Sequence, residues 1–491
     1  MNTHTKNPSH LCAFLFGVLT LVATAPEGII KEAYPPLHLE NVSAYLLQQK
    51  GVPPQQRSIA RNPFAAQLGS AFALAALEER IQYPDTMEYR IAQRLKNRLR
   101  LHGEASPSVP ALANAIRQRQ QLLRRALTVT FQTQDGGEYG TWDVSLQRYP
   151  TWVAATITSG TASFHTSSDR ITADLANYLQ ENIAPPVDVR ARAVSQTGSV
   201  ARIVVDDIAM PGYEIDTATL AKEMEDSLNE GTAAIVAPMS YRNGQITLMH
   251  NGQERTLQLI SSGRSNFKGS TWARMKNVRK ALREHVNNAL IEQGAMFSFN
   301  AALNPPVTLS KGWSMAKVIY NGTELRESPG GGICQASTTT FRAIVNGGFP
   351  VVDRKSHSLY VTYYKQYGVG IDATVYPGSQ DLRFMNDTAD ILVLQAYDTE
   401  DLDAVVNIYG IPDGRTVELA GPFFASSAPD ELQVNGRAVW YNEIVWLQDV
   451  RYSNGQTRSE QIVSRYLNMP RSLSAEFPSP LEIQTIALGL E

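Results

Sequence analysis

The chain has 491 residues, of which 43% are hydrophobic and 19% charged, and its formal net charge is -3. This is the composition of a folded protein, and the length indicates about three domains. Because binding to nucleic-acid phosphates requires a clustered basic surface, the near-neutral charge argues against a nucleic-acid partner.

The N-terminus has the pattern of an export signal. Lys6 precedes an apolar run over residues 11–25, which ends in the small-x-small triplet Ala23-Thr24-Ala25. A helix of this length reaches about 22 Å, short of a hydrocarbon core of about 30 Å, so cleavage is favoured over a permanent span. We expect residues 1–25 to be a signal peptide, with an uncleaved membrane anchor or a buried N-terminal helix as alternatives. The protein is then secreted or anchored outside the cytoplasmic membrane.

Residues 34–125 are predicted to form a helical region. Asn62-Pro63 provides a cap followed by a proline at the first helical position, and begins an Ala- and Leu-rich segment that reaches Gln82. Further helices are expected over 89–101 and 112–126, each with a basic face that we interpret as solvated.

The hydrophobic period changes at Leu127, where we predict a small α+β domain over 127–245. Short apolar strands alternate there with amphipathic helices. The second helix has a cap at Asp216 and ends at Gly231. The expected strands are 128–131, 141–144, 187–194, 201–208 and 233–237, and the expected helices are 171–183 and 216–231.

The same signals place the remaining elements. Asn251-Gly252 is a typical two-residue hairpin turn within 246–263. We predict domains over 263–410 and 411–491. Their expected elements are a helix at 271–293, strands at 359–364, 391–396 and 404–409, a linker at 420–433 and a C-terminal hairpin at 440–455.

The stretch with the clearest chemical character surrounds Cys334. Three glycines at 330–332 permit positive φ angles and leave the chain bare, so that another molecule can approach closely. A short helix is expected next, opened by Ser337 or Thr338 as its cap. A thiol just before a helix N-terminus has a lowered pKa, which favours the thiolate.

Cysteine usage separates two interpretations of this thiol. The only other cysteine, Cys12, lies in the signal, so Cys334 cannot form an internal disulfide in the exported body. It is then either a buried, inert side chain or a reactive group. The glycine-rich and polar flanks favour the reactive group.

Two downstream residues complete a candidate catalytic set. His357, at the entrance of an expected strand, is a candidate general base for the thiol. Asp372 is placed to accept the second N–H of that imidazole, as the third member of a triad does. The alternatives are a histidine bonded to a carbonyl and an aspartate in a simple turn. The backbone N–H groups of Gly332, Ile333 and Cys334 are candidates for an oxyanion site.

These residues also carry a resemblance to the VanW family, roughly over 263–410. The family is named after an accessory gene product of glycopeptide-resistance clusters, and its members include exported envelope proteins. The layout of 127–245 resembles the peptidoglycan-binding-like domain that often precedes VanW domains. The matching runs are Met296-Phe297-Ser298-Phe299-Asn300, Gly330 to Ser337, His357-Ser358-Leu359, Asp372-Ala373-Thr374-Val375 and Asp381-Leu382-Arg383-Phe384.

The resemblance implies an L,D-transpeptidase-type acyl transfer on peptidoglycan stem peptides, with Cys334 as the nucleophile. The loop that then faces the substrate or its oxyanion consists of Gly330, Gly331, Gly332, Ile333, Gln335 and Ser337. The candidates for the substrate groove are Asn300, Trp313, Ser358 and Tyr360. The alternative is a non-catalytic protein, accessory to glycopeptide resistance, that binds or scaffolds peptidoglycan through the same groove.

Other chemistries are disfavoured. No P-loop, Gly-x-Ser-x-Gly or His-Glu-x-x-His motif occurs, and the scattered histidines do not match a zinc site, so we expect neither a metal nor a cofactor. We therefore predict an α+β multidomain protein with a helical N-terminal region, a small α+β domain, a mixed α/β VanW-like domain and a β-rich C-terminal part. Its expected partners are stem peptides, glycan and, through the N-terminal segment, the membrane.

Overall fold

The structure is a computed structural model that describes residues 86–102, 106–477 and 481–483. The predicted signal at 1–25 and the predicted helix at 62–82 lie outside these residues. The described chain is a multidomain α+β protein, as the sequence predicts. It divides into two compact units, one running to Ala184 and including Tyr213–Tyr241, the other comprising Pro185–Gly212 and the chain from Arg242 onward.

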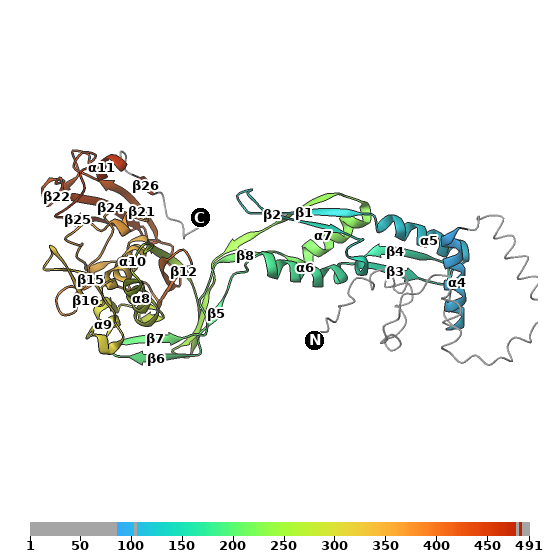
Figure 1. The fold of residues 1–491 in the computed structure, drawn as a ribbon, viewed down its shortest axis with the longest axis horizontal. Coiled ribbons are helices and arrows are strands. Elements are labelled where there is room, and N and C mark those ends of the chain that lie inside the picture. Colours follow the sequence, from blue (N-terminus) through green and yellow to red (C-terminus); the bar gives the residue numbers. More distant parts are fainter. Residues whose placement is uncertain (1–85, 103–105, 478–480, 484–491) are drawn as a thin grey trace, which may run out of the picture. The chain divides into compact units, whose positions relative to one another are not determined.

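The first unit is built on a three-stranded sheet of order β2-β1-β9 (Figure 1). Apolar side chains of this sheet and of two helices, α6 and α7, share one buried core that contains Trp142 and Leu175. Thr86 and Ser108 accept capping hydrogen bonds at the starts of α4 and α5. The elements are α4 (Met87–Leu101), α5 (Val109–Leu122), α6 (Ser168–Asn182), α7 (Thr217–Glu230), η2 (Pro150–Trp152), β1 (Ala126–Gln132), β2 (Glu138–Ser145), β3 (Val153–Ile157), β4 (Ala162–Thr166), β8 (Gly212–Glu214), β9 (Ala234–Pro238) and β10 (Ser240–Arg242).

The second unit contains an eight-stranded sheet of order β5-β11-β12-β20-β19-β13-β7-β6. Both faces of this sheet are buried: along β20, Ile408 belongs to one core and its neighbour Tyr409 to the other, as the period of two in a strand requires. The strands are β5 (Val189–Arg190), β6 (Ala193–Thr197), β7 (Val200–Val204), β11 (Ile246–His250), β12 (Gln253–Asn266), β13 (Ala289–Ile291), β19 (Leu392–Asp398) and β20 (Asp403–Gly410).

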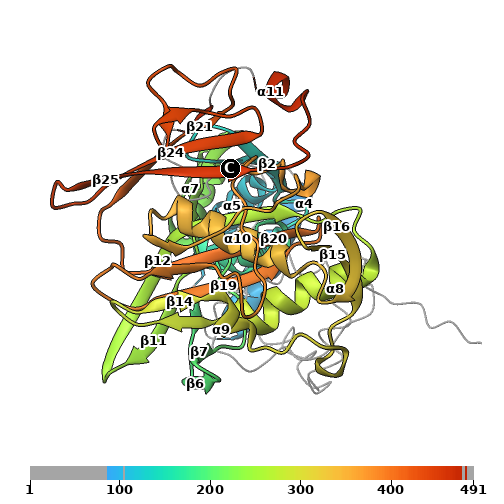
Figure 2. The ribbon, with the colours of Figure 1, turned by 90° about the vertical axis from the view of Figure 1, so that its left-hand side faces the viewer.

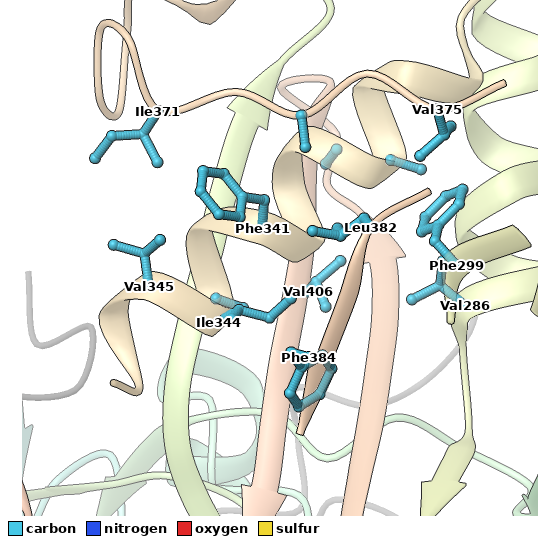
Figure 3. Close-up of a cluster of buried hydrophobic side chains, with 14 of the residues drawn as sticks. Val286, Phe299, Phe341, Ile344, Val345, Ile371, Val375, Leu382, Phe384 and Val406 are labelled. Carbon is cyan, nitrogen blue, oxygen red and sulfur yellow. The ribbon is translucent and has the colours of Figure 1, made fainter. Parts of the chain in front are cut away.

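Helix α10 (Ile333–Asn346) covers one face of that sheet, over β12 and β20 (Figure 2). Figure 3 shows its Phe341, Ile344 and Val345 in the core that also contains Phe384 and Val406. The helix lies very close to β12 because the sheet offers Gly263 there: a Cβ at this position would stand 2.2 Å from the Thr339 carbonyl oxygen. The glycine therefore sets the distance between the helix and the sheet.

A second sheet, of order β25-β24-β21-β26, completes this unit. Its Trp446 and Ile462 belong to the same core as α10, and the Trp446 indole donates to the Val369 carbonyl at 2.8 Å. The strands are β21 (Thr416–Phe423), β24 (Glu443–Arg451), β25 (Thr457–Arg465) and β26 (Leu481–Ile483). The C-terminal region is therefore part of the body that holds α10.

The smaller elements of the second unit connect these layers. They are α8 (Trp272–Lys280), the π-helix η3 (Ala281–Val286), α9 (Phe299–Leu303), η4 (Leu309–Lys311), η5 (Thr362–Tyr364), α11 (Leu473–Glu476), β14 (Met296–Ser298), β15 (Met315–Tyr320), β16 (Glu324–Pro329), β17 (Val351–Asp353), β18 (Arg383–Met385), β22 (Gln433–Val434) and β23 (Arg437–Ala438). Within the described ranges, no helix combines the length and apolar character that crossing a membrane requires.

The hairpin at Asn251-Gly252, the helix from Asp216 to Gly231 and the strands β19 and β20 confirm the sequence predictions. Three other predictions are wrong in whole or in part. The helix expected over 271–293 ends at Val286, because β13 pairs there with β7 and β19. The strand expected over 359–364 is a loop with a 3₁₀ turn, in which the Tyr360 N–H donates to the Asn468 side chain. The linker expected over 420–433 begins inside β21, where a register shift accommodates Pro422.

The two compact units also differ from the predicted division of the chain. Pro185–Gly212 contributes β5, β6 and β7 to the large sheet of the second unit, although this segment was predicted within 127–245. In the first unit, α5 packs against β4, so the described helices share one body with the strands that follow.

Candidate active site

A glycine turn places Cys334 in the first turn of α10. Gly330 and Gly332 have φ angles of +84° and +112°, which side chains rarely adopt. A Cβ on Gly331 would stand 2.5 Å from the Ala316 carbonyl oxygen, so the turn packs directly on β15. The helix begins at Ile333, earlier than the predicted caps Ser337 and Thr338, and Cys334 is its second residue.

The polar residues that follow Cys334 are satisfied inside the helix. Thr339 and Thr340 donate their hydroxyls to the carbonyls four residues back, of Gln335 and Ala336, at 2.8 and 2.9 Å. This back-bonding lets a threonine-rich segment lie fully buried in the core. The sequence analysis took this polar flank as a sign of a reactive thiol, because the burial of the hydroxyls cannot be seen in the sequence.

His357 and Asp372 lie together and are both buried. The Asp372 carboxylate oxygen Oδ2 is 2.5 Å from His357 Nδ1 and also accepts the His357 backbone N–H at 3.1 Å. Because an ionised carboxylate only accepts, Nδ1 carries the proton, and the other ring nitrogen is left for the thiol. Cys334 is partly buried, and its Sγ is 3.6 Å from both Thr374 Oγ1 and the Val375 carbonyl oxygen.

Cys334 and His357 change each other's pKa. Burial alone raises the pKa of Cys334, but the hydrogen bond and charge of His357 outweigh it and lower the pKa below the ordinary thiol value. Burial alone lowers the pKa of His357, but Asp372 and Cys334 raise it to about 9. The pKa of Asp372 is also lowered, because His357 and Arg354 outweigh its burial. At neutral pH His357 is therefore an imidazolium beside the Asp372 carboxylate, and its charge favours the thiolate form of Cys334.

The loop that carries Asp372 is held by a buried arginine. Arg342, in the middle of α10, donates to the backbone carbonyls of Arg264, Tyr364, Gln366, Gly368 and Ile371. Burial lowers the pKa of Arg342 to about 10, so the guanidinium stays charged at neutral pH. The helix that presents the thiol thus also fixes the segment before the carboxylate.

The predicted oxyanion donors are not equivalent. The Ile333 N–H donates to the Gly330 carbonyl at 3.0 Å, so it is occupied within the turn. The N–H groups of Gly332 and Cys334 donate to no acceptor among the described residues. These two donors remain candidates for an oxyanion formed next to the sulfur.

Two loop residues predicted to face the substrate are buried instead. Gln335 bonds to Arg274, Ser265 and the Asn266 carbonyl, and Ser337 donates to the Ala373 carbonyl at 2.6 Å. Both side chains are fully buried. Gln335 lies on the side of α10 that faces β12, and Ser337 lies on the side that faces the segment after Asp372. Their polar side chains join α10 to the surrounding segments, so the prediction that they contact substrate is wrong.

The predicted groove residues are dispersed. Trp313 is buried against the His285 ring at 5.2 Å and is a core residue, so its assignment to a groove is wrong. The Asn300 side chain donates a hydrogen bond to the Gln380 carbonyl and forms none with Cys334, His357 or Asp372. Tyr360 is partly buried, with its ring 5.5 Å from that of Tyr466, and Ser358 is next to His357.

One edge of the site is formed by the hairpin of β15 and β16. β16 ends at Pro329, directly before the glycine turn, and a Cβ on Gly322 at the hairpin tip would lie 3.6 Å from the Ser358 side chain. The hairpin therefore extends from the thiol turn to the residue after His357. Most of its side chains are exposed.

A hollow of about 410 Å³ lies next to η5. The Arg274 guanidinium covers the ring of Tyr363 in its wall at 4.7 Å, and donates to Gln335 beside Cys334 at 2.7 Å. The residues that line it are Asn266, Thr362, Tyr363, Lys365, Gln366 and Phe477. Among the described residues, no three His, Cys, Asp or Glu side chains are grouped as metal ligands.

Sequence reasoning missed the groups that hold Asp372. Its second oxygen, Oδ1, accepts from the Tyr466 hydroxyl at 2.7 Å and from Arg354 at 3.3 Å. Arg354 lies three residues before His357, and this closeness in the sequence was a signal that could have found it. Tyr466 gave no signal, because it is 94 residues from Asp372 in the sequence.

Comparison with known proteins gives a family match over part of the second unit. Residues 273–409 match the family described as VanW like protein. The chain is 35% identical over 130 residues to the uncharacterized protein YoaR of Bacillus subtilis (strain 168). That alignment covers 26% of this chain and 41% of the relative, so the chain spans about two fifths of that relative's length. No solved structure matches the chain. Residues 273–409, which contain Cys334, His357 and Asp372, are therefore a VanW-like domain, and the resemblance to the VanW family is confirmed.

Proposed function

We propose that the protein is exported and acts in the cell envelope as a cysteine-dependent acyltransferase of the L,D-transpeptidase type on peptidoglycan stem peptides. The observation that carries the proposal is the Cys334, His357 and Asp372 arrangement at the start of α10. The 2.5 Å contact between His357 Nδ1 and Asp372 Oδ2 orients the imidazole, as in a nucleophile–base–acid triad.

The first half of the proposed reaction forms a thioester. The Cys334 thiolate attacks the carbonyl carbon of the bond that joins a stem peptide to its terminal residue. The resulting oxyanion would be stabilised by the field of the α10 N-terminus and by the N–H groups of Gly332 and Cys334, which donate to no acceptor among the described residues. The C–N bond then breaks, and the leaving amine takes the proton from the His357 imidazolium.

The second half transfers the acyl group. A neutral amine of another stem peptide attacks the thioester, His357 accepts a proton from that amine, and the thiolate leaves. The products are one amide cross-link and the released terminal amino acid, and the enzyme returns to its imidazolium–thiolate form. No oxidant, metal or cofactor is consumed.

A non-catalytic role in binding peptidoglycan is the second candidate function. Cys334 is only partly exposed, and its neutral thiol can donate to the Val375 carbonyl at 3.6 Å, an arrangement that also suits an unreactive cysteine. The exposed β15–β16 hairpin and the hollow beside η5 then provide contacts for glycan or peptide. The reactivity of the thiol separates the two functions.

The reaction products distinguish the acyltransferase from the non-catalytic binding protein. Purified protein is incubated with disaccharide-tetrapeptides, and the mixture is analysed by mass spectrometry. We expect cross-linked dimers with the loss of one terminal amino acid, their absence with Cys334→Ala and Cys334→Ser, and unchanged yield with the control His250→Gln, whose histidine bonds to Glu292. Dimers that persist without the Cys334 sulfur would remove the thiol from the mechanism.

A further inference from the structure

Tyr466 contacts the candidate catalytic carboxylate from outside the VanW-like domain. It directly follows β25, and only 2% of its surface is exposed. Its hydroxyl donates to Asp372 Oδ1 at 2.7 Å. Its backbone is fixed on both sides, because its N–H donates to the Asn442 carbonyl and its own carbonyl accepts from the Asn442 side chain.

The two oxygens of Asp372 are divided between two partners. Oδ2 faces His357, and Oδ1 faces Tyr466 and Arg354. Arg354 is itself held by β25: it donates to the Val463 carbonyl at 2.8 Å and to the Ser464 hydroxyl at 2.5 Å. Strand β25 therefore supports the side of the carboxylate that is opposite to the imidazole.

The chemistry of a phenol suits this position. Burial and the Asp372 charge raise the pKa of Tyr466 well above its ordinary range, so the hydroxyl is a neutral donor at neutral pH. A neutral donor fixes the rotation of the carboxylate and leaves its negative charge for His357. The other ionisable groups that act on Asp372 or His357 are Arg342, Arg354, Tyr360, Tyr364 and Cys334.

We propose that Tyr466 is a positioning residue of this site, which holds Asp372 so that Oδ2 stays directed at His357. The C-terminal sheet is then part of the functional unit, although the family match ends at residue 409. The inference rests on the proposed function only for its effect on turnover. The effect on thiol reactivity follows from the contacts alone.

The test uses Tyr466→Phe, which keeps the buried ring and removes one hydroxyl. Alkylation of Cys334 by iodoacetamide is measured across pH by mass spectrometry of the full chain. We expect the apparent pKa of the thiol to rise, with about tenfold slower alkylation near pH 7, because a rotating carboxylate supports the imidazolium less well. If disaccharide-tetrapeptides are turned over, kcat falls by a similar factor and KM is unchanged.

The matched control is Tyr409→Phe. Tyr409 is a buried tyrosine of the same unit whose hydroxyl donates to the Ala209 carbonyl, on the other face of the large sheet. It should leave the alkylation profile unchanged. If alkylation of Cys334 against pH is the same in Tyr466→Phe and in the control, the proposal is overturned. A tyrosine that only packs in the core would give that result.

Two further outcomes are informative. If Tyr466→Phe melts at a much lower temperature than wild type, Ser464→Ala takes its place, since it loosens Arg354 and should shift the same pKa by less. If wild type forms no cross-links but Tyr466→Phe still shifts the thiol pKa, the positioning role stands and the proposed function fails. An unshifted thiol pKa in Tyr466→Phe, or in Ser464→Ala where it takes the place of that variant, rejects the positioning role even where cross-linking is active.

Discussion

Two effects act on the sulfur of Cys334, and their magnitudes differ. A helix N-terminus stabilises a nearby anion by about 0.3–1 kcal/mol. An imidazolium in hydrogen-bond contact lowers a neighbouring pKa by about 1–3 units, equivalent to about 1.4–4 kcal/mol. His357 is therefore the larger cause of thiolate formation, and the position of Cys334 at the start of α10 adds a smaller contribution.

Replacing His357 should make Cys334 an ordinary thiol. In His357→Gln we expect alkylation by iodoacetamide at pH 7 to slow by at least about tenfold, because only about 3% of a thiol with a pKa near 8.5 is ionised there. His250→Gln is the control, since that histidine bonds to Glu292 away from the site. Equal rates in the two variants would mean that His357 does not activate the thiol, and would favour the binding role.

The turnover of stem peptides should decrease at alkaline pH. The leaving amine needs the proton of the imidazolium, and the pKa of His357 is raised to about 9 by Asp372 and Cys334. Since the group is protonated below this value, the rate should be retained up to about pH 8 and lost as the pH rises through about 9. The profile of kcat against pH is the measurement. A kcat that already falls with rising pH below pH 7 would contradict the proposal that Asp372 and Cys334 keep His357 protonated.

At the scale of elements, the distance between α10 and β12 depends on one glycine. A Cβ on Gly263 would meet the backbone of α10, at 2.2 Å from the Thr339 oxygen and 2.4 Å from the Ala343 nitrogen. Backbone atoms cannot move aside as the end of a flexible side chain can. The helix must shift as a whole, and Cys334 shifts with it.

Gly263→Ala should therefore lower the stability of the second unit by about 1–3 kcal/mol, the usual cost of an overpacked core. It should also change the alkylation rate of Cys334. Thermal unfolding and alkylation of the same sample provide both values. Gly140→Ala is the control, because a Cβ there has no atom within 4 Å. Identical melting of the two variants would show that α10 is not held at this distance.

The elements that were predicted correctly are those whose signals lie close together in the sequence. The hairpin turn at Asn251-Gly252 and the cap and stop of α7 at Asp216 and Gly231 are decided by residues within a few positions. The element predicted too long, over 271–293, fails because Ala289–Ile291 is a strand only through its pairing with two distant partners. The buried start of α10 was missed because its threonines satisfy themselves inside the helix.

At the scale of the whole molecule, the candidate site needs parts that are far apart in the chain. The motif residues Cys334, His357 and Asp372 could be predicted because the VanW-like pattern and the chemistry of each side chain point to them. Tyr466 and Arg342 could not, because their roles depend on contacts 94 residues away and on five carbonyl oxygens brought together by folding. The candidate catalytic residues can therefore be predicted from the sequence, whereas the residues that hold them in place cannot.

The two compact units suggest how to separate wall binding from chemistry. Deleting 127–245 would remove β5, β6 and β7 from the large sheet, so a cleaner variant lacks 86–184 and 213–241. The ends left at Gly212 and Arg242 can be joined by a short linker, because β8 and β10 pair there. We expect Cys334 alkylation to be retained and sedimentation with purified peptidoglycan to weaken. Unchanged sedimentation would assign wall contact to the second unit.

The central claim is that Cys334 forms a thioester with a stem peptide. Acid quenching during turnover, followed by intact-mass and peptide mass spectrometry, tests it most directly. The account predicts an adduct with the mass of the stem acyl group on the peptide that contains Cys334, and its accumulation when the acceptor amine is acetylated. Cross-linked product formed at full rate, with no adduct on Cys334 at any quench time and none trapped with acetylated acceptor, would contradict the account.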